Sequence, residues 1–95
     1  MVRAAAPALG EGGRIISTGS TVGERVLLPG LADYAATKAA VAAYTLGWAR
    51  DLGPRGITVN LVQPGPVDTD MNPDGTDFAA TLKAATALGR YGRPE

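Results

Sequence analysis

The sequence contains neither cysteine nor histidine. The absence of cysteine excludes disulfide frameworks, thiolate zinc sites and cysteine nucleophiles. The absence of histidine excludes every catalytic triad and metal site that depends on an imidazole. We therefore expect any chemistry of this chain to use hydroxyl, lysine or carboxylate groups, and we expect no metal site.

The sequence also lacks an excess of charge of either sign, because nine lysines and arginines balance nine acidic residues. The basic residues are scattered, whereas proteins that bind nucleic acids or anionic membranes gather them in patches. No apolar run approaches the roughly 20 residues that span a bilayer. The opening stretch MVRAAAPALG is too short and too weakly apolar for a signal peptide. We expect a cytoplasmic protein whose partners are neither nucleic acid nor membrane.

The 95 residues that are present suffice for one domain at most. A β-branched run at 14–19 ends in glycine, and a helical pattern over 33–52 stops at a Gly-Pro pair. The nearly all-apolar run 57–62 is typical of a parallel strand covered on both faces. A weaker helical pattern covers 78–88. A strand, a long helix and a second strand in this order predict an α/β fold with parallel strands.

Polar residues gather where this pattern predicts the carboxyl edge of the sheet. Ser20 follows the first strand, Tyr34 opens the long helix, and the QPGPV stretch follows the second strand. Ligands of open α/β sheets bind outside the carboxyl ends of the strands. Ser20, Tyr34 and Lys38 are therefore candidates for a binding crevice.

The helix places Tyr34 and Lys38 one turn apart on a single stripe. This stripe continues through Val41, Thr45, Trp48 and Leu52, and its lower part is apolar enough to face the sheet. A solvated tyrosine with a lysine that extends to water is the alternative interpretation. An extension of the inward stripe up to the edge of the sheet favours the crevice.

Three successive segments, GRIISTGS, YAATK and GITVNLVQPGPVDTDM, resemble the short-chain dehydrogenase/reductase family. The resemblance covers the chain from about residue 12 to its end. It implies part of a Rossmann-type, doubly wound parallel sheet, of which only the βαβ portion is present and the N-terminal half is missing. Residues 1–95 would then be a single partial domain, truncated at both ends.

The resemblance implies a catalytic role for Ser20, Tyr34 and Lys38. Tyr34 would be the general acid/base, and the neighbouring ammonium of Lys38 would favour its phenolate form and bind the cofactor ribose. Ser20 would orient the substrate oxygen for Tyr34, since there is no histidine to make it a nucleophile. The nearby hydroxyls that compete with Ser20 for this role are Ser17, Thr18 and Thr21.

The resemblance also implies an NAD or NADP cofactor, bound by Tyr34, Lys38 and the segment QPGPVDT. In that segment Pro64 and Gly65 would turn tightly beside the nicotinamide ring. Val67 and Thr69 would contact the carboxamide and phosphate regions of the cofactor. An ordinary turn at the end of a strand is the alternative. Asn60, within the second strand, would be a buried structural amide with hydrogen-bond partners.

The sequence departs from the family pattern in its phosphate-binding part. The family's Thr-Gly-x-x-x-Gly-x-Gly turn, which seats a pyrophosphate on a helix N-terminus, is absent. LGEGG contains three glycines but precedes the wrong strand. The residue that selects NAD or NADP and the family's catalytic asparagine are also missing.

DMNPDG at 70–75 matches the opening of a calcium-binding EF-hand loop. The twelfth position of that loop should be a bidentate glutamate but is Thr81, and a strand precedes it where a helix should. The plainer interpretation is a solvated, turn-rich substrate lid.

Three hypotheses for the function follow. The first is an NAD(P)-dependent oxidoreductase that transfers hydride between nicotinamide and a small carbonyl compound or secondary alcohol. The second is a catalytically incompetent fragment that acts at most as an oligomer-interface module, because the alanine-rich helix 33–52 would pair with a second copy. The third is a relative of the sugar-nucleotide epimerases and dehydratases, which share the Tyr/Lys pair.

Overall fold

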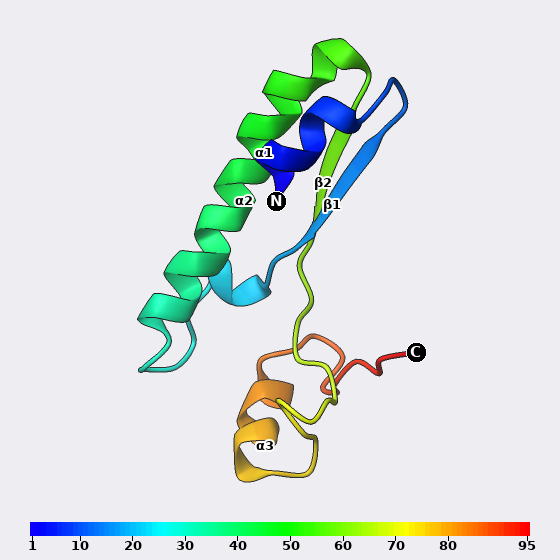
Figure 1. The fold of residues 1–95 in the computed structure, drawn as a ribbon. Helices are drawn as coiled ribbons and strands as arrows, with labels where there is room; N and C mark the ends of the chain where they lie inside the picture. Colours follow the sequence, from blue (N-terminus) through cyan, green and yellow to red (C-terminus); the bar gives the residue numbers. More distant parts are fainter. The chain divides into compact units, whose positions relative to one another are not determined.

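A strand, a long helix and a second strand form the main part of the molecule (Figure 1). The computed structural model describes residues 1–95 and divides into two compact units, Met1–Gln63 and Pro64–Glu95. The elements of the first unit are α1 (Val2–Ala5), β1 (Arg14–Thr18), α2 (Ala32–Leu52) and β2 (Thr58–Val62), with the 3-10 turns η1 (Ala6–Ala8), η2 (Thr21–Gly23) and η3 (Gly53–Arg55). The second unit contains α3 (Asp77–Ala84).

β1 and β2 pair in parallel, in a register that runs from Arg14 opposite Thr58 to Thr18 opposite Val62. The pairing continues past the end of β1, because the amide of Gly19 donates to the Val62 carbonyl at 2.7 Å. α2 makes the crossover between the two strands and lies along them (Figure 1). The predicted α/β fold with parallel strands is confirmed.

α2 begins one residue before the predicted helix and ends where the pattern predicts. Its alanines are strong helix formers, and Asp33 in the first turn and Arg50 in the last turn complement the helix dipole. After η3, Gly56 takes a left-handed conformation at φ 69° and turns the chain into β2. None of the helices combines the length and the apolarity that crossing a bilayer requires.

The core of the first unit lies between α2 and one face of the sheet. Leu52, Ile57 and Val59 form its buried centre, and Ile15 and Trp48 pack against them. The predicted inward stripe of α2 points here: its members from Lys38 to Leu52 are half-buried or buried, whereas Tyr34 at the top is 46% exposed.

The other face of the sheet is uncovered. Ile16 is 65% exposed and Val62 54%, and the alternate residues of both strands share this exposure. The all-apolar run 57–62 predicted cover on both faces, but this chain supplies cover for one only. Asn60 points to the open face and is exposed, so the expectation that it is a buried amide is wrong. Because side chains alternate along a strand, its position between Val59 and Leu61 puts it on the face opposite to theirs.

The second unit is built around α3 and the last residues of the chain. The Thr76 hydroxyl caps α3 by accepting from the Ala79 amide at 3.0 Å. α3 ends at Ala84, earlier than the pattern 78–88 predicts, because the last turn tightens: the amides of Ala85 and Thr86 donate to the carbonyls of Leu82 and Lys83, three residues back. Ala79 and Tyr91 are the buried residues of this unit.

Candidate active site

Ser20 lies where the chain leaves the carboxyl end of β1. The preceding Gly19 is buried against the Leu61 side chain, whose Cδ1 would lie 3.1 Å from a Cβ at this position. Ser20 itself is half-buried and extended, at φ −161° and ψ 147°. Its Oγ accepts a hydrogen bond from the Val22 amide at 3.2 Å and so caps η2. A hydroxyl that accepts in this way still has its own proton to donate.

η2 is seated directly on α2, which fixes the position of Ser20 relative to the helix. A Cβ at Gly23 would lie 3.0 Å from the Ala39 nitrogen and 3.1 Å from the Lys38 carbonyl carbon. Only glycine allows this approach of two backbones. At the same edge the side-chain amide of Gln63 donates through Nε2 to Glu24 Oε1 at 3.1 Å. The turn that carries Ser20 is therefore held against both the helix and the end of β2.

Lys38 links the start of α2 to the end of β1. Its Nζ donates to the Thr18 carbonyl at 3.4 Å, a long hydrogen bond, and lies 5.7 Å from the centroid of the Tyr34 ring. An ammonium has three N–H donors, so donors remain for a ligand. The Tyr34 hydroxyl has no hydrogen-bond partner within the chain. The structure therefore brings Tyr34 and Lys38 together at the carboxyl edge of the sheet, in the same part of the first unit as Ser20.

The rival hydroxyls occupy different positions. Ser17 is half-buried within β1, and Thr18 ends that strand with its carbonyl bonded to Lys38. Thr21 is exposed in η2. Ser20 alone of the four stands between the strand and the turn.

The proposed cofactor-contact residues Pro64, Gly65, Val67 and Thr69 all lie in the second unit. Val67 is half-buried and forms a parallel bridge with Gly92, and Thr69 is exposed. The Thr69 carbonyl accepts from the Asn72 amide at 3.0 Å and closes a turn.

The LGEGG turn lies at the amino end of β1, at the opposite edge from Tyr34. The amides of its last two glycines are already used: Gly12 donates to the Gly56 carbonyl at 3.1 Å and Gly13 to the Gly10 carbonyl at 3.0 Å, and the turn is followed by β1 and not by a helix. A pyrophosphate seat needs free amides at a helix N-terminus. This turn therefore does not replace the missing glycine motif.

The loop that resembles an EF-hand opening is folded on its own groups. Asp68 Oδ1 accepts from the Asp74 amide at 2.9 Å, and Asp74 Oδ1 forms an ion pair with Lys83 at 2.5 Å. The hydrogen bond from Lys83 lowers the pKa of Asp74 below its ordinary value, although burial acts in the opposite direction. The charge of this carboxylate is thus matched by a lysine of α3.

Comparison with known proteins gives matches along the whole chain. A family model described as enoyl-(acyl carrier protein) reductase matches residues 1–95. The cyclic-di-GMP-binding biofilm dispersal mediator protein of Escherichia coli is 50% identical over 91 residues, which cover 96% of this chain and 38% of that protein. The cyclohexanol dehydrogenase of Rhodococcus sp. strain TK6 is 48% identical over 86 residues, or 87% of this chain and 32% of that protein.

Among solved structures, a short chain dehydrogenase from Burkholderia cenocepacia, crystallised in complex with NADP, superimposes with a TM-score of 0.92. It is 55% identical, and the match covers 96% of this chain and 37% of that one. The chain thus spans about a third of the length of the proteins that it matches.

Proposed function

We propose, because this chain belongs to the short-chain dehydrogenase/reductase family, that it carries the acid/base part of an NAD(P)-dependent oxidoreductase active site. The reaction would be hydride transfer between nicotinamide and a small carbonyl compound or secondary alcohol. The observation that carries the proposal is the placement of the Lys38 ammonium 5.7 Å from the Tyr34 ring at the carboxyl edge of β1.

Tyr34 is the proposed general acid/base. Its hydroxyl has no partner in the chain and its side chain is 46% exposed, so a substrate oxygen can reach it. In the reductive direction the hydroxyl protonates the carbonyl oxygen, and in the oxidative direction the phenolate takes the alcohol proton. Such proton transfer by a positioned group contributes about 10²–10⁴-fold to a rate.

Lys38 supports this step in two ways. Its ammonium contacts both the Tyr34 ring and the Thr18 carbonyl, and so holds the ring at the carboxyl edge of β1. The ammonium has donors left beside its bond to Thr18, and these can bind the hydroxyls of a ribose.

Ser20 is the proposed substrate-orienting residue. Its oxygen is fixed by the Val22 amide, and its turn is fixed on α2 through the close approach at Gly23. The hydroxyl proton can then be donated to the substrate oxygen that Tyr34 protonates. Correct placement of the reacting oxygen is itself a large part of catalysis.

The residues present fit the nicotinamide end of a dinucleotide. Free polar groups of Tyr34 and Lys38 stand at the sheet edge where such cofactors bind. Pro64, Gly65, Val67 and Thr69 are the proposed nicotinamide contacts. The cofactor supplies or accepts the hydride when bound. The NADP complex of the Burkholderia cenocepacia relative supports this assignment, while the chain itself contains no glycine turn for the pyrophosphate.

Cofactor binding tests the proposal directly. NADPH is titrated into the purified chain and its nicotinamide fluorescence is followed. We expect weak binding, because the pyrophosphate seat is absent, and a further loss of about tenfold in Lys38→Met, which keeps the length of the side chain but removes its charge. Arg50→Met is the matched control, since Arg50 is an exposed cation in the last turn of the same helix, at the end away from Tyr34. No binding at millimolar NADPH would overturn the proposal.

A second role is favoured by the outer face of α2. Leu46 is 74% exposed and Tyr44 59%, and Ala36, Ala40 and Ala43 beside them are also exposed. Small residues let another helix approach closely. We propose that this face pairs with a second copy of the chain. Sedimentation velocity should then show a dimer that Leu46→Arg dissociates, whereas a monomeric wild-type chain excludes the pairing.

A further inference from the structure

Tyr91 is the most deeply buried polar side chain of the second unit. It is 4% exposed, and its hydroxyl donates to Asn72 Oδ1 at 3.0 Å. Buried tyrosines need such a partner for the hydroxyl. This bond connects the end of the chain to the turn that Thr69 and Asn72 close.

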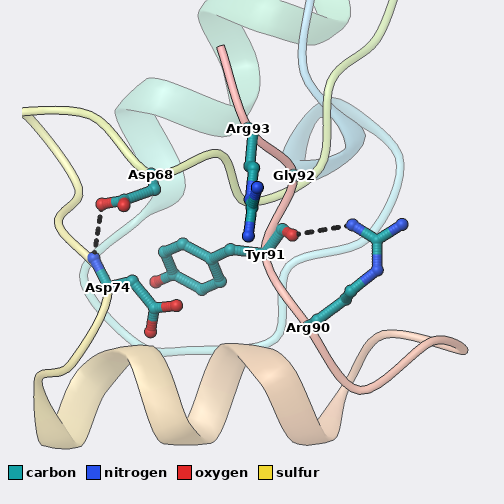
Figure 2. Close-up of a pocket in the computed structure, with 6 residues that line it drawn as sticks. All are labelled: Asp68, Asp74, Arg90, Tyr91, Gly92 and Arg93. Carbon is teal, nitrogen blue, oxygen red and sulfur yellow. Dashed lines mark hydrogen bonds between the residues drawn. The ribbon is translucent and has the colours of Figure 1, made fainter. Parts of the chain in front are cut away.

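The ring of Tyr91 is also held from α3. The ammonium of Lys83 lies 5.9 Å from the ring centroid and pairs with Asp74 at 2.5 Å. Figure 2 shows the Tyr91 hydroxyl on the side of Asp74, above the helix. Lys83 thus contacts both the ring and the loop, so that neither can shift without losing an interaction.

Gly92 adds two backbone hydrogen bonds to the same segment. Its amide donates to the Pro66 carbonyl at 2.9 Å, and its carbonyl accepts from the Asp68 amide at 3.1 Å. These bonds bracket Val67, whose Cγ2 would lie in van der Waals contact, at 3.5 Å, with a Cβ at Gly92. Val67 and Thr69 therefore lie between fixed points on both sides.

We infer that Tyr91 is a positioning residue for cofactor binding: with Gly92 it clamps segment 66–72 and so presents Val67 and Thr69 to the nicotinamide. The inference rests on the proposed function. The segment contains no helix or strand of its own, so its shape depends on these contacts. A binding loop held in its bound shape before the ligand arrives avoids the cost of ordering on binding.

The hollow beside the clamp has no such role. It is lined by Asp68, Asp74, Arg90, Tyr91, Gly92 and Arg93. The Arg90 guanidinium is turned back to the Tyr91 carbonyl at 3.1 Å (Figure 2). Two carboxylates and two guanidiniums line it, so no single ligand charge is favoured.

Two measurements on the full chain test the clamp. The first is amide hydrogen exchange at Asp68 and Asn72, whose amides are bonded within the segment. We expect Tyr91→Phe, which deletes only the hydroxyl, and Asn72→Leu, which deletes the acceptor, to speed this exchange about tenfold. Asn72→Asp keeps an oxygen acceptor for the Tyr91 hydroxyl, so its exchange should be as slow as in the wild type. Amides of α2 should not change. Equal exchange in wild type and Tyr91→Phe, or no protection in the wild type, overturns the clamp.

The second measurement is the dissociation constant for reduced nicotinamide mononucleotide, which carries only the nicotinamide end of the cofactor. We expect about tenfold weaker binding in Tyr91→Phe and wild-type binding in Asn72→Asp. A purely structural tyrosine would lower stability without this change. Binding that is equal in wild type and Tyr91→Phe overturns the inference and leaves the proposed function intact. Failure of the wild type to bind overturns the proposed function and, with it, the positioning role.

Discussion

The ammonium of Lys38 lies 5.7 Å from the centre of the Tyr34 ring, one turn further along the same face of α2. The same ammonium reaches the Thr18 carbonyl, so Lys38 connects the start of α2 to the end of β1, while the Tyr34 side chain stays 46% exposed. Lys38 is half-buried, and its contact with the Tyr34 ring is the observation that favours a pair over two independent surface residues.

Replacement of Tyr34 by phenylalanine should abolish most of the turnover. The test system is a chimaera in which this chain replaces the matched segment of the Rhodococcus cyclohexanol dehydrogenase. We expect kcat for cyclohexanol oxidation to fall about 10²–10⁴-fold, because the ring remains but cannot exchange a proton. Tyr44→Phe is the control: Tyr44 is on the same helix and stacks on Trp48 at 5.0 Å through its ring. Equal rates in the two variants would remove Tyr34 from the mechanism.

Substitution of Gly23 by alanine should destabilise the first unit. The new Cβ would meet backbone atoms of Lys38 and Ala39 at 3.0–3.1 Å, and a helix backbone cannot move aside locally. We expect a loss of about 1–3 kcal/mol in the free energy of unfolding, measured with urea.

Gly47→Ala is the matched control for this prediction. Gly47 lies within α2, and a Cβ at this position would meet no atom within 4 Å. Alanine should therefore stabilise the helix by about 0.5–1 kcal/mol. If Gly23→Ala lowers the free energy of unfolding and Gly47→Ala raises it, the close packing of η2 on α2 is established. A lower free energy of unfolding in both variants would contradict it.

The ion pair of Asp74 and Lys83 should make the stability of the second unit depend on pH. Lys83 lowers the native pKa of Asp74 below its ordinary value of 3.8. The pair therefore stabilises the native state at neutral pH, and this contribution is lost as the pH falls through the lowered native pKa.

The measurement compares the melting of wild type and Asp74→Asn between pH 7 and pH 3. The wild type should melt higher at neutral pH, and the difference should close as the pH falls. Asp70→Asn, on the same loop, is the control. A difference that stays constant over this range would mean that the carboxylate charge has no part in it.

The first unit follows closely from the sequence because its signals are local. Alanine content, Asp33 and the Gly-Pro stop determine α2, and period-3.6 spacing predicted which of its residues face the sheet. The proximity of Lys38 to Tyr34 follows from their spacing on one helix. The position of Ser20 at the strand end follows from the parallel pairing.

The second unit could not be predicted in the same way. Its organisation depends on contacts between residues far apart in the chain, such as Tyr91 with Asn72 and Val67 with Gly92. Such pairs leave no periodic pattern in the sequence. The only indication of a buried residue there was Tyr91, an aromatic side chain in a polar, turn-rich stretch. The exposure of Asn60 was missed for a related reason: an apolar run does not reveal how many of its faces find cover.

The uncovered face of the β1–β2 sheet has a consequence for the stability of the first unit. Ile16 and Val62 offer β-branched side chains to water beside strand edges that pair with nothing. Apolar surface that is removed from water stabilises a folded structure by about 25 cal/mol per Å². Any layer that covers this face would therefore add to the stability of the sheet by burying Ile16 and Val62.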